Sequence, residues 1–216
     1  MKKTIAILGA GGNMGSNIAK NLARAGYRLL LADRDVSKLS ETLKAIKATT
    51  PKANVELIDC AREADIIIPA VSYLAQAEVA QKIKDVVTGK IIISIANPLN
   101  ETFDGLLTEP TTSAAEELAK LLPHSNIVKA FNTTFAADFT SPRLGGATID
   151  CFVAGADHEA AEAVSELVRD AGFNPIIAGK LSVSRTLEQM ALLLVSLTQR
   201  YNYNWLVGWK VLHQAA

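Results

Sequence analysis

Short apolar runs alternate with stretches of helical periodicity along most of the chain. The runs are nearly unbroken, which is typical of strands buried on both faces of a parallel sheet. They predict strands over residues 4–8, 27–32, 55–58, 65–70, 91–95, 126–130, 149–154 and 173–178. The stretches between them predict helices over residues 14–25, 36–48, 73–86, 113–122 and 158–171. Alternating strands and helices indicate an α/β fold with a doubly wound, mostly parallel sheet.

A glycine-rich turn joins the first predicted strand to the first predicted helix. Glycines let a backbone turn sharply and approach a pyrophosphate, and the N–H groups at a helix N-terminus hold phosphate. Read from Ala10, the turn fits the dinucleotide-binding fingerprint of the Rossmann fold, with Gly12 and Gly15 as its second and third glycines. The candidate cofactor-binding residues of this stretch are Gly9, Gly11, Gly12, Asn13, Met14 and Gly15, with Gly15 packing the helix against the sheet. A Walker-type loop is excluded because no Lys-Ser or Lys-Thr pair follows; an ordinary strand–helix turn is the alternative.

Asp33 lies at the end of the second predicted strand, where an acidic residue accepts hydrogen bonds from the adenosine ribose. A carboxylate there repels a 2′-phosphate and favours NAD. The guanidinium of Arg34 pairs with a 2′-phosphate or stacks on adenine, and therefore favours NADP. We give the carboxylate more weight and expect a slight preference for NAD. The alternative role for Asp33 is to cap the helix that begins near Val36, which Asp35 would do equally well.

Polar residues also follow later strands, where ligands of doubly wound sheets bind. Ser72 is placed to contact the pyrophosphate or the nicotinamide ribose, and the alternative is a plain cap of the next helix. Tyr73 would stack on the cofactor or form a wall of the site. Asn97, followed by Pro98, offers a carboxamide toward the cofactor, and Asn132 follows the strand at the same edge of the sheet.

The carboxy-terminal part has a different pattern. Residues 182–200 predict one long helix that is apolar on every side over residues 190–195, and such a helix is buried against the sheet domain, a partner subunit or both. An aromatic cluster follows, made of Tyr201, Tyr203, Trp205 and Trp209. It predicts a subunit contact or part of a substrate pocket. We therefore divide the chain into a Rossmann domain over residues 1–180 and a helical extension over residues 181–216, and expect a homodimer through the extension.

A proton donor for the reduction of a carbonyl group is missing from the pattern. No tyrosine is followed four places later by lysine, and the three histidines, His124, His158 and His213, are expected at the surface. Lys129, within the strand over residues 126–130, either faces the site or is an ordinary surface or edge lysine, and we expect the latter. No acid–base residue is therefore assigned. Hydride exchange between two stacked rings needs mainly geometry, so the pattern favours a flavin-like ring as the partner of a nicotinamide.

Composition narrows the class of partner. The chain of 216 residues is 49% hydrophobic and has 22 basic and 22 acidic side chains, so its charge gives no support for a nucleic acid or an anionic membrane as partner. No apolar run is long enough to span a bilayer. Cys60 and Cys151 lack the spacing of a metal site, and we expect two buried thiols rather than a disulfide, no metal, and a cytoplasmic location.

Four motifs in register resemble the NADPH-dependent coenzyme F420 reductase family. They are LGAGGNMG at residues 8–15, Asn97-Pro98, KAFNT at residues 129–133 and GKLSVSRTLE at residues 179–188. The resemblance covers nearly the whole chain and is strongest to bacterial members known only as dinucleotide-binding oxidoreductases. The chain also resembles the cytosolic nicotinamide-binding domain of the six-transmembrane ferric reductases, whose membrane-spanning half it lacks.

The resemblance implies an NAD(P)-dependent oxidoreductase that passes hydride between a nicotinamide and a flavin or deazaflavin. It implies a ribose and nicotinamide wall of Val71, Ser72 and Tyr73, a nicotinamide pocket of Asn97, Asn132 and Ala136, and a second-substrate border of Ser182, Ser184 and Arg185. The archaeal enzymes carry serine where Asp33 stands and histidine where Asn132 stands, which leaves NADP preference and the deazaflavin substrate open. The alternatives are an imine or carbonyl reductase of the pyrroline-carboxylate or hydroxyacid type, and a non-catalytic NAD(P)-sensing module.

Overall fold

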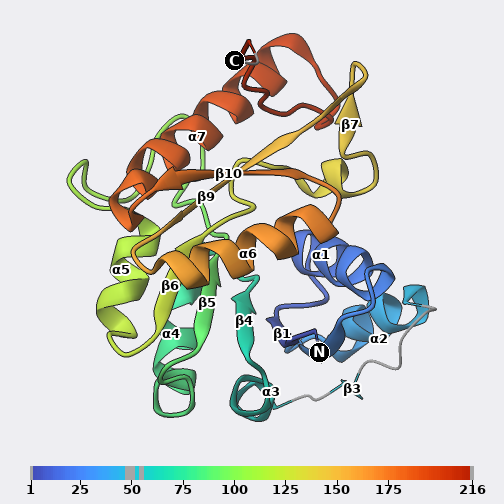
Figure 1. Ribbon diagram of the computed structural model, residues 1–216, viewed down its shortest axis with the longest axis vertical. Coiled ribbons are helices and arrows are strands. Elements are labelled where there is room, and N and C mark those ends of the chain that lie inside the picture. Colours follow the sequence, from blue (N-terminus) through green and yellow to red (C-terminus); the bar gives the residue numbers. More distant parts are fainter. Residues whose placement is uncertain (1, 47–51, 54–55, 215–216) are drawn as a thin grey trace.

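A central sheet organises the structure, a computed structural model that describes residues 2–46, 52–53 and 56–214. Its described strands are β1 (Thr4–Leu8), β2 (Arg28–Ala32), β3 (Lys52–Ala53), β4 (Ile66–Pro69), β5 (Ile91–Ser94), β6 (Asn126–Lys129), β9 (Asp150–Gly155) and β10 (Asn174–Gly179). Their spatial order is β3-β2-β1-β4-β5-β6-β9-β10, and every neighbouring pair is parallel except β6 and β9 (Figure 1). The order from β3 to β6 is that of the Rossmann fold, so the predicted fold class is confirmed.

Helices cover both faces of the sheet. One face carries α1 (Asn13–Arg24), α2 (Val36–Ala45) and α6 (His158–Asp170). The other carries α3 (Leu57–Glu63), α4 (Tyr73–Ile83) and α5 (Ala114–Leu121), and α7 (Ser184–Tyr201) packs beside them over β9. Shorter elements are the 3-10 turns η1 (Lys84–Val86), η2 (Ala136–Phe139) and η3 (Leu181–Val183), and the hairpin of β7 (Arg143–Leu144) and β8 (Ala147–Thr148).

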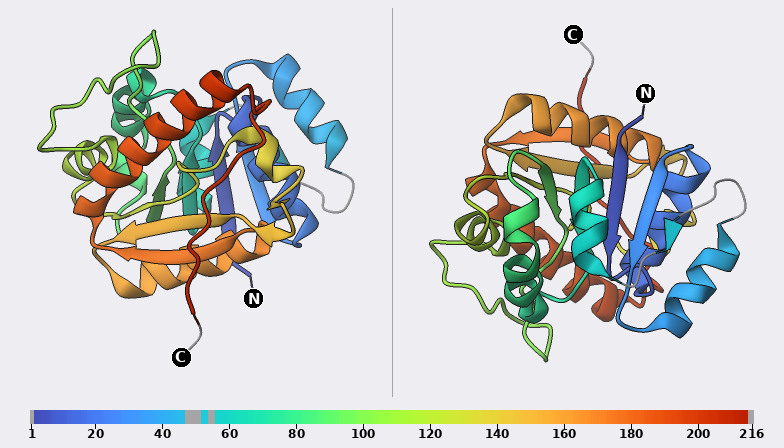
Figure 2. Two further views of the ribbon diagram at one scale, coloured as in Figure 1. Left: turned by 90° about the horizontal axis from the view of Figure 1, so that it is seen from above. Right: turned by 90° about the horizontal axis from the view of Figure 1, so that it is seen from below.

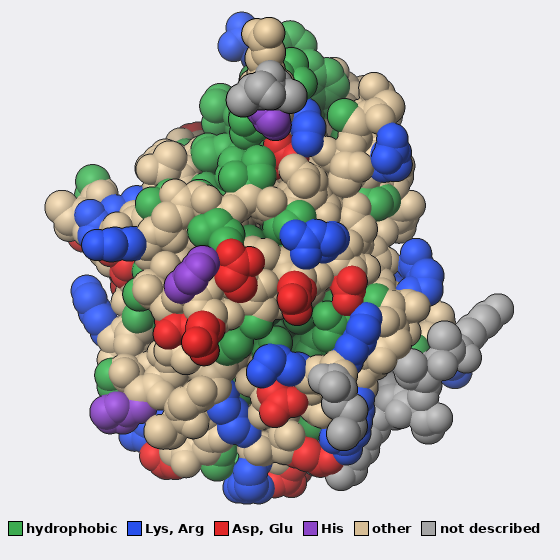
Figure 3. All heavy atoms as spheres, in the orientation of Figure 1, with side chains coloured by type: hydrophobic (Ala, Val, Ile, Leu, Met, Phe, Trp, Pro, Cys, Tyr) green, Lys and Arg blue, Asp and Glu red, His purple; other side chains and the backbone are tan. Residues whose placement is uncertain are grey.

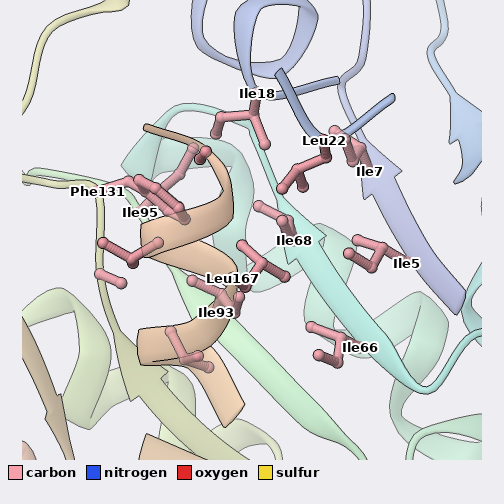
Figure 4. Close-up of a cluster of buried hydrophobic side chains, with 14 of the residues drawn as sticks. Ile5, Ile7, Ile18, Leu22, Ile66, Ile68, Ile93, Ile95, Phe131 and Leu167 are labelled. Carbon is pink, nitrogen blue, oxygen red and sulfur yellow. The ribbon is translucent and has the colours of Figure 1, made fainter. Parts of the chain in front are cut away.

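Alternation along the strands builds a core on each face. Ile5 and Ile7 of β1 face α1 and α6, whereas Ala6 and Leu8 face α3 and α4. Figure 4 shows the first of these cores, where side chains of β1, β4 and β5 meet those of α1 and α6. Full burial of one such aliphatic side chain contributes about 1.5–3 kcal/mol. The core therefore holds the strand ends, and the loops that follow them, in a fixed frame.

The predicted elements are confirmed with one exception, apart from residues 47–48 of the second predicted helix, which lie outside the described residues. Residues 55–58 were expected to form a strand followed by a turn, but residues 57–63 form α3, and residue 55 lies outside the described residues. A short apolar run does not distinguish a strand from a buried helix turn. Here Cys60 and Ala61 complete the apolar side of α3 and are buried against the sheet.

Within the single chain α7 is buried on one face only, so the expected burial of its other face against a partner subunit stays a prediction. Leu187, Ala191 and Leu194 are buried, whereas Leu193 is 49% exposed. One face of α7 therefore packs on the sheet and the opposite face is open to solvent. Beyond α7 the chain turns back and crosses β9 and β10 (Figure 2), and Asp150 of β9 forms an isolated antiparallel bridge with Trp209.

Candidate cofactor-binding site

The loops that carry the predicted cofactor residues follow the carboxyl ends of parallel strands. β1 lies between β2 and β4, so the loop after β1 leads toward one edge of the sheet and the loop after β4 leads toward the other. Such a switch in strand order opens a crevice in which doubly wound sheets bind nucleotides. The glycine turn after β1 lies at this crevice, with the loop after β4 directly against it, because Gly9 approaches Ala70 and Val71.

The fold itself requires glycine at three positions of this turn. Gly9 has a φ of +95°, and a Cβ there would lie 2.4 Å from the Ala70 carbonyl oxygen. A Cβ on Gly15 would lie 2.2 Å from the Gly9 oxygen, which confirms that Gly15 packs the first helix closely against the strand turn. A Cβ on Gly11 would lie 2.7 Å from the Cβ of Lys38. These glycines fix the path of the turn whether or not a ligand is bound.

No steric contact within the chain requires glycine at position 12. Its φ of −73° and ψ of 166° suit any residue, and a Cβ there would find no atom closer than the Gly9 oxygen at 3.4 Å. Gly12 caps α1 without a side-chain acceptor, and the first turn of α1 contains no acidic residue. The backbone N–H groups of Asn13 and Met14 at this end suit an anion. The space a Cβ would fill fits the close approach of a pyrophosphate.

Asp33 holds the glycine turn to the end of β2. Its Oδ2 accepts a hydrogen bond from the Gly11 N–H at 2.8 Å, and its Oδ1 accepts one from the Asp35 N–H at 2.8 Å. Asp35 caps α2 by accepting from the N–H groups of Ser37 and Lys38. The alternative role of helix cap therefore belongs to Asp35. Arg34 is exposed beside this carboxylate.

Ser72 and Tyr73 begin α4 after β4. Ser72 occupies the cap position but makes no side-chain capping hydrogen bond, and it is exposed. Its hydroxyl is therefore available at the crevice. The Tyr73 hydroxyl donates to Glu117 of α5 at 2.7 Å. Burial, followed by that hydrogen bond, raises the pKa of Tyr73 to about 12, so its side chain is a neutral half-buried phenol.

Asn97 and Asn132 join the loops after β5 and β6. The Asn97 Nδ2 donates to the Asn132 carbonyl at 2.8 Å, and the Asn132 Nδ2 donates to the Asn97 Oδ1 at 3.0 Å and to the Leu187 carbonyl at 2.9 Å. The Asn132 Oδ1 is buried without a hydrogen-bond partner in the described part of the chain. Phe131, just before it, adopts a φ of +60°, a strained conformation for a bulky residue that shapes this loop.

Two further predicted residues frame these carboxamides. Pro98 is buried behind Asn97, and Ala136 is half-buried at the first position of η2. The carboxy-terminal tail reaches the same loop, because the ring of Trp205 meets the ring of Phe135 edge to face at 5.2 Å. The tail therefore borders the loop that follows β6.

Lys129 is not a surface lysine, contrary to expectation. Its side chain is fully buried, and its Nζ donates to Glu188 Oε1 at 2.6 Å and to the Ala96 carbonyl at 2.5 Å. The second oxygen of Glu188 accepts from the Ala114 N–H at 3.0 Å, at the start of α5. Burial lowers the pKa of Lys129, and the charge of Glu188 opposes that shift. The strand β6 is thus tied to α7 and α5 by one ion pair.

The residues expected at the second-substrate border differ in their surroundings. Ser182 is exposed on η3, whereas Ser184 is fully buried and its Oγ has no hydrogen-bond partner in the described part of the chain. Arg185 makes two hydrogen bonds with Glu116 of α5, at 2.8 and 2.6 Å. The Glu116 side chain raises the pKa of Arg185, so the guanidinium stays charged while it faces α5.

The opposite edge of the sheet carries none of these residues. A hollow of about 650 Å³ lies there, lined by charged residues that include Lys3, Asp65, Lys90 and Asp157. The three histidines are exposed, as expected, and both cysteines are buried as thiols. The predicted cofactor residues and the buried ion pair thus lie away from this hollow, at the carboxyl edge.

Comparisons with known proteins agree with this geometry. The model of a family described as NADP oxidoreductase coenzyme F420-dependent matches residues 4–98. The F420-dependent NADP reductase of Methanocaldococcus jannaschii is 30% identical over 214 residues, which cover 91% of this chain and 93% of the relative. Metalloreductase STEAP3 of Rattus norvegicus is 27% identical over 88% of this chain but only 37% of its own length.

A solved structure shows the same fold. A crystal structure from Arthrobacter sp. FB24, provisionally assigned as an F420-dependent NADP reductase, superposes with a TM-score of 0.87 at 24% identity, over 97% of this chain and 99% of that one. None of the described helices has the length and hydropathy needed to cross a membrane.

Proposed function

Because the chain belongs to the family of coenzyme F420-dependent NADP oxidoreductases and is an NAD(P)-dependent oxidoreductase, we propose that it transfers hydride between a nicotinamide and a flavin or deazaflavin ring. One observation carries the choice of acceptor. The ionisable side chains of Tyr73, Lys129 and Arg185 at the carboxyl edge are each bound to a glutamate of the chain itself. None of the three is placed as a proton donor to a carbonyl or imine, whereas exchange between two rings depends on their stacking.

Backbone and small polar groups bind and orient the nicotinamide cofactor in this proposal. The N–H groups at the start of α1 hold its pyrophosphate over Gly12, and the Asp33 carboxylate accepts from its adenosine ribose. Ser72 contacts the pyrophosphate or the second ribose. When bound, the nicotinamide supplies or accepts the hydride. Asn97, Asn132 and Ala136 surround the nicotinamide ring and set the face it presents.

We also propose a slight preference for NAD over NADP. Both oxygens of Asp33 accept hydrogen bonds from backbone N–H groups, which hold its carboxylate next to the proposed ribose position. A 2′-phosphate would meet that charge. Arg34 is exposed beside it and would reduce the difference, so the preference is expected to be small.

The second copy of the chain is the proposed partner of the open face of α7. Leu193 and Tyr201 are exposed on α7, and Leu212, in the segment beyond it, is 87% exposed. Figure 3 shows hydrophobic side chains gathered at the end of the molecule where the carboxy-terminal segment lies. Contiguous exposed apolar surface of this kind marks an interface, and a homodimer would bury it on both subunits. Ser182 and Arg185, on the first turns of this region, are the proposed border of the flavin or deazaflavin pocket.

A titration of the pure protein tests the proposed reaction. NADH and NADPH are added first, and FAD, FMN, riboflavin and coenzyme F420 are then added in turn while the absorbance of the reduced nicotinamide is followed. We expect oxidation with at least one ring acceptor and none with cyclic imines or 2-oxo acids. Tight nicotinamide binding with no oxidation by any ring would indicate a binding module instead. Oxidation by an imine alone would indicate the pyrroline-carboxylate type of reductase.

A further inference from the structure

We propose that Lys129 and Glu188 are positioning residues, which set the geometry of the nicotinamide pocket by locking α7 onto the two loops that form it. This inference rests on the proposed placement of the nicotinamide between Asn97 and Asn132. Neither side chain is exposed, so neither is proposed to touch the cofactor or its partner.

The pair acts on the loop after β5 through a backbone oxygen. Lys129 Nζ donates to the carbonyl of Ala96 at 2.5 Å, and Ala96 is the residue directly before Asn97. The same Nζ is held by Glu188 Oε1 at 2.6 Å. The position of Asn97 along its loop is therefore fixed from one side by a charged hydrogen bond, which is shorter and stronger than a neutral one.

The neighbouring residue of α7 fixes the other loop. The carbonyl of Leu187 accepts from the Asn132 Nδ2 at 2.9 Å, and that nitrogen also donates to Asn97 at 3.0 Å. Two consecutive residues of α7 thus hold both carboxamides. A third tie runs from Glu188 to the first N–H of α5, whose Glu117 binds the Tyr73 hydroxyl. The network therefore includes a group on each of the loops after β4, β5 and β6.

Stability alone does not account for the ion pair. An apolar pair of similar volume at a buried site is often as stable as an ion pair or more stable, because both charges lose their hydration. Apolar side chains, however, have no preferred direction, whereas the ammonium and carboxylate make directional hydrogen bonds to each other, to the Ala96 carbonyl and to the Ala114 N–H. The ionic pair is therefore suited to fixing position, and its value lies in the placement of the loops.

The closing experiment compares two ligands that share the adenine half. ADP-ribose occupies the proposed pyrophosphate and ribose positions and lacks the nicotinamide, so the ratio of the NADH affinity to the ADP-ribose affinity reports the nicotinamide pocket without any turnover. The main variant is Lys129→Met combined with Glu188→Leu, which removes both charges together and leaves neither one buried alone. Lys129→Gln combined with Glu188→Gln is the second variant for use if the first double variant does not fold, because it also leaves no charge buried alone and keeps side chains that form hydrogen bonds. Val168→Ala, a buried change on α6, is the control for a loss of stability.

We expect the NADH to ADP-ribose ratio to fall about tenfold in the Met and Leu double variant, less in the double Gln variant, and not at all in Val168→Ala, since small displacements of a pocket reduce ring-specific contacts. The maximal rate with the flavin or deazaflavin acceptor should fall with it, while the KM for the acceptor changes less. An unchanged ratio in the charge variants, or an equal loss of both ligands, would overturn the positioning role. A wild-type protein that binds NADH but reduces no ring would overturn the proposed function and leave the ratio readable.

Discussion

The Asp33 carboxylate accepts a hydrogen bond from the Gly11 N–H at 2.8 Å, which joins the end of β2 to the glycine turn after β1. The same carboxylate binds the N–H of Asp35. One side chain therefore has two tasks: it braces the turn that would hold the pyrophosphate, and it presents negative charge where the adenosine ribose would lie.

Replacement of Asp33 by serine should shift nucleotide preference toward NADPH. The change removes the charge that would repel a 2′-phosphate and leaves Arg34 beside it. We expect the ratio of the two dissociation constants, measured by titration of each nucleotide, to move about tenfold in favour of NADPH. Asp35→Ala is the control: it removes the cap of α2 at a cost of about 1 kcal/mol and should leave the ratio where it was. If the ratio of the two dissociation constants is unchanged in Asp33→Ser, Asp33 only stabilises the glycine turn and does not select the nucleotide.

Gly12 and Gly15 should respond to substitution in opposite ways. Gly12→Val places its side chain in open space, so the free energy of unfolding should fall by only about 1 kcal/mol while nucleotide binding is lost. Gly15→Ala forces a Cβ to within 2.2 Å of the Gly9 oxygen. We expect a loss of about 1–3 kcal/mol in stability there, as for other overpacked sites. Calorimetric titration and urea unfolding of both variants measure the two effects. Retained affinity in Gly12→Val would place the pyrophosphate elsewhere.

Asp138 should make stability decrease as pH rises through the acid range. Its side chain is fully buried in η2, and burial raises its pKa from 3.8 to about 7, an effect that the N–H groups of Phe135 and Val207 offset only in part. Between about pH 4 and pH 7, Asp138 therefore keeps its proton in the folded chain but has released it in the unfolded chain. The free energy of unfolding should therefore be highest below about pH 4, fall by a few kcal/mol, and level off above about pH 7.

Asp138→Asn tests that origin. The amide cannot ionise, so the variant should lose most of the slope and be more stable than the wild type above about pH 7. Urea unfolding at a series of pH values measures both curves. Parallel curves for the two proteins would assign the slope to other groups.

A charge on the open face of α7 should separate the proposed homodimer. Leu193→Glu combined with Leu212→Glu introduces carboxylates at two exposed apolar positions. The melting temperature should stay within a few degrees, because neither side chain belongs to the core, while sedimentation shows a monomer. Val36→Glu, an equally exposed apolar position on α2, should leave the dimer intact. If the wild-type protein sediments as a monomer, the proposed homodimer is wrong.

Periodicity is sufficient to predict most of this fold, because the strands are buried on both faces and their apolar runs are hard to mistake. The glycine turn and the residues after β4, β5 and β6 were found for the same reason: each follows a strand that the pattern marks clearly. The pattern misplaced residues 55–58, since a short apolar run fits either element. It also left the exposed face of α7 undetected, since residues 190–195 carry no polar side chain to mark it.

The sequence does not show that Lys129 and Glu188 form an ion pair, although the position of each residue indicates that it is buried. Lys129 interrupts an otherwise apolar strand, and Glu188 follows Ser184 by four residues and precedes Ala191 by three, on the face of α7 that is buried. Such interruptions indicate a buried partner somewhere. The identity of that partner depends on how β6, β9 and α7 pack together, and the sequence pattern does not contain this tertiary information. The division of the chain near residue 180 remains a prediction.

The order of synthesis gives the same ion pair another consequence. Lys129 leaves the ribosome 59 residues before the carboxylate that neutralises it. Until α7 has emerged, a nascent chain that closed its sheet would have to bury an uncompensated ammonium, which is strongly unfavourable. The amino-terminal strands can assemble early, but the loops that would hold the nicotinamide cannot reach their final form before the last helix arrives. The pocket is therefore the last part of the molecule to mature, and a chain that stops short of α7 would not complete it.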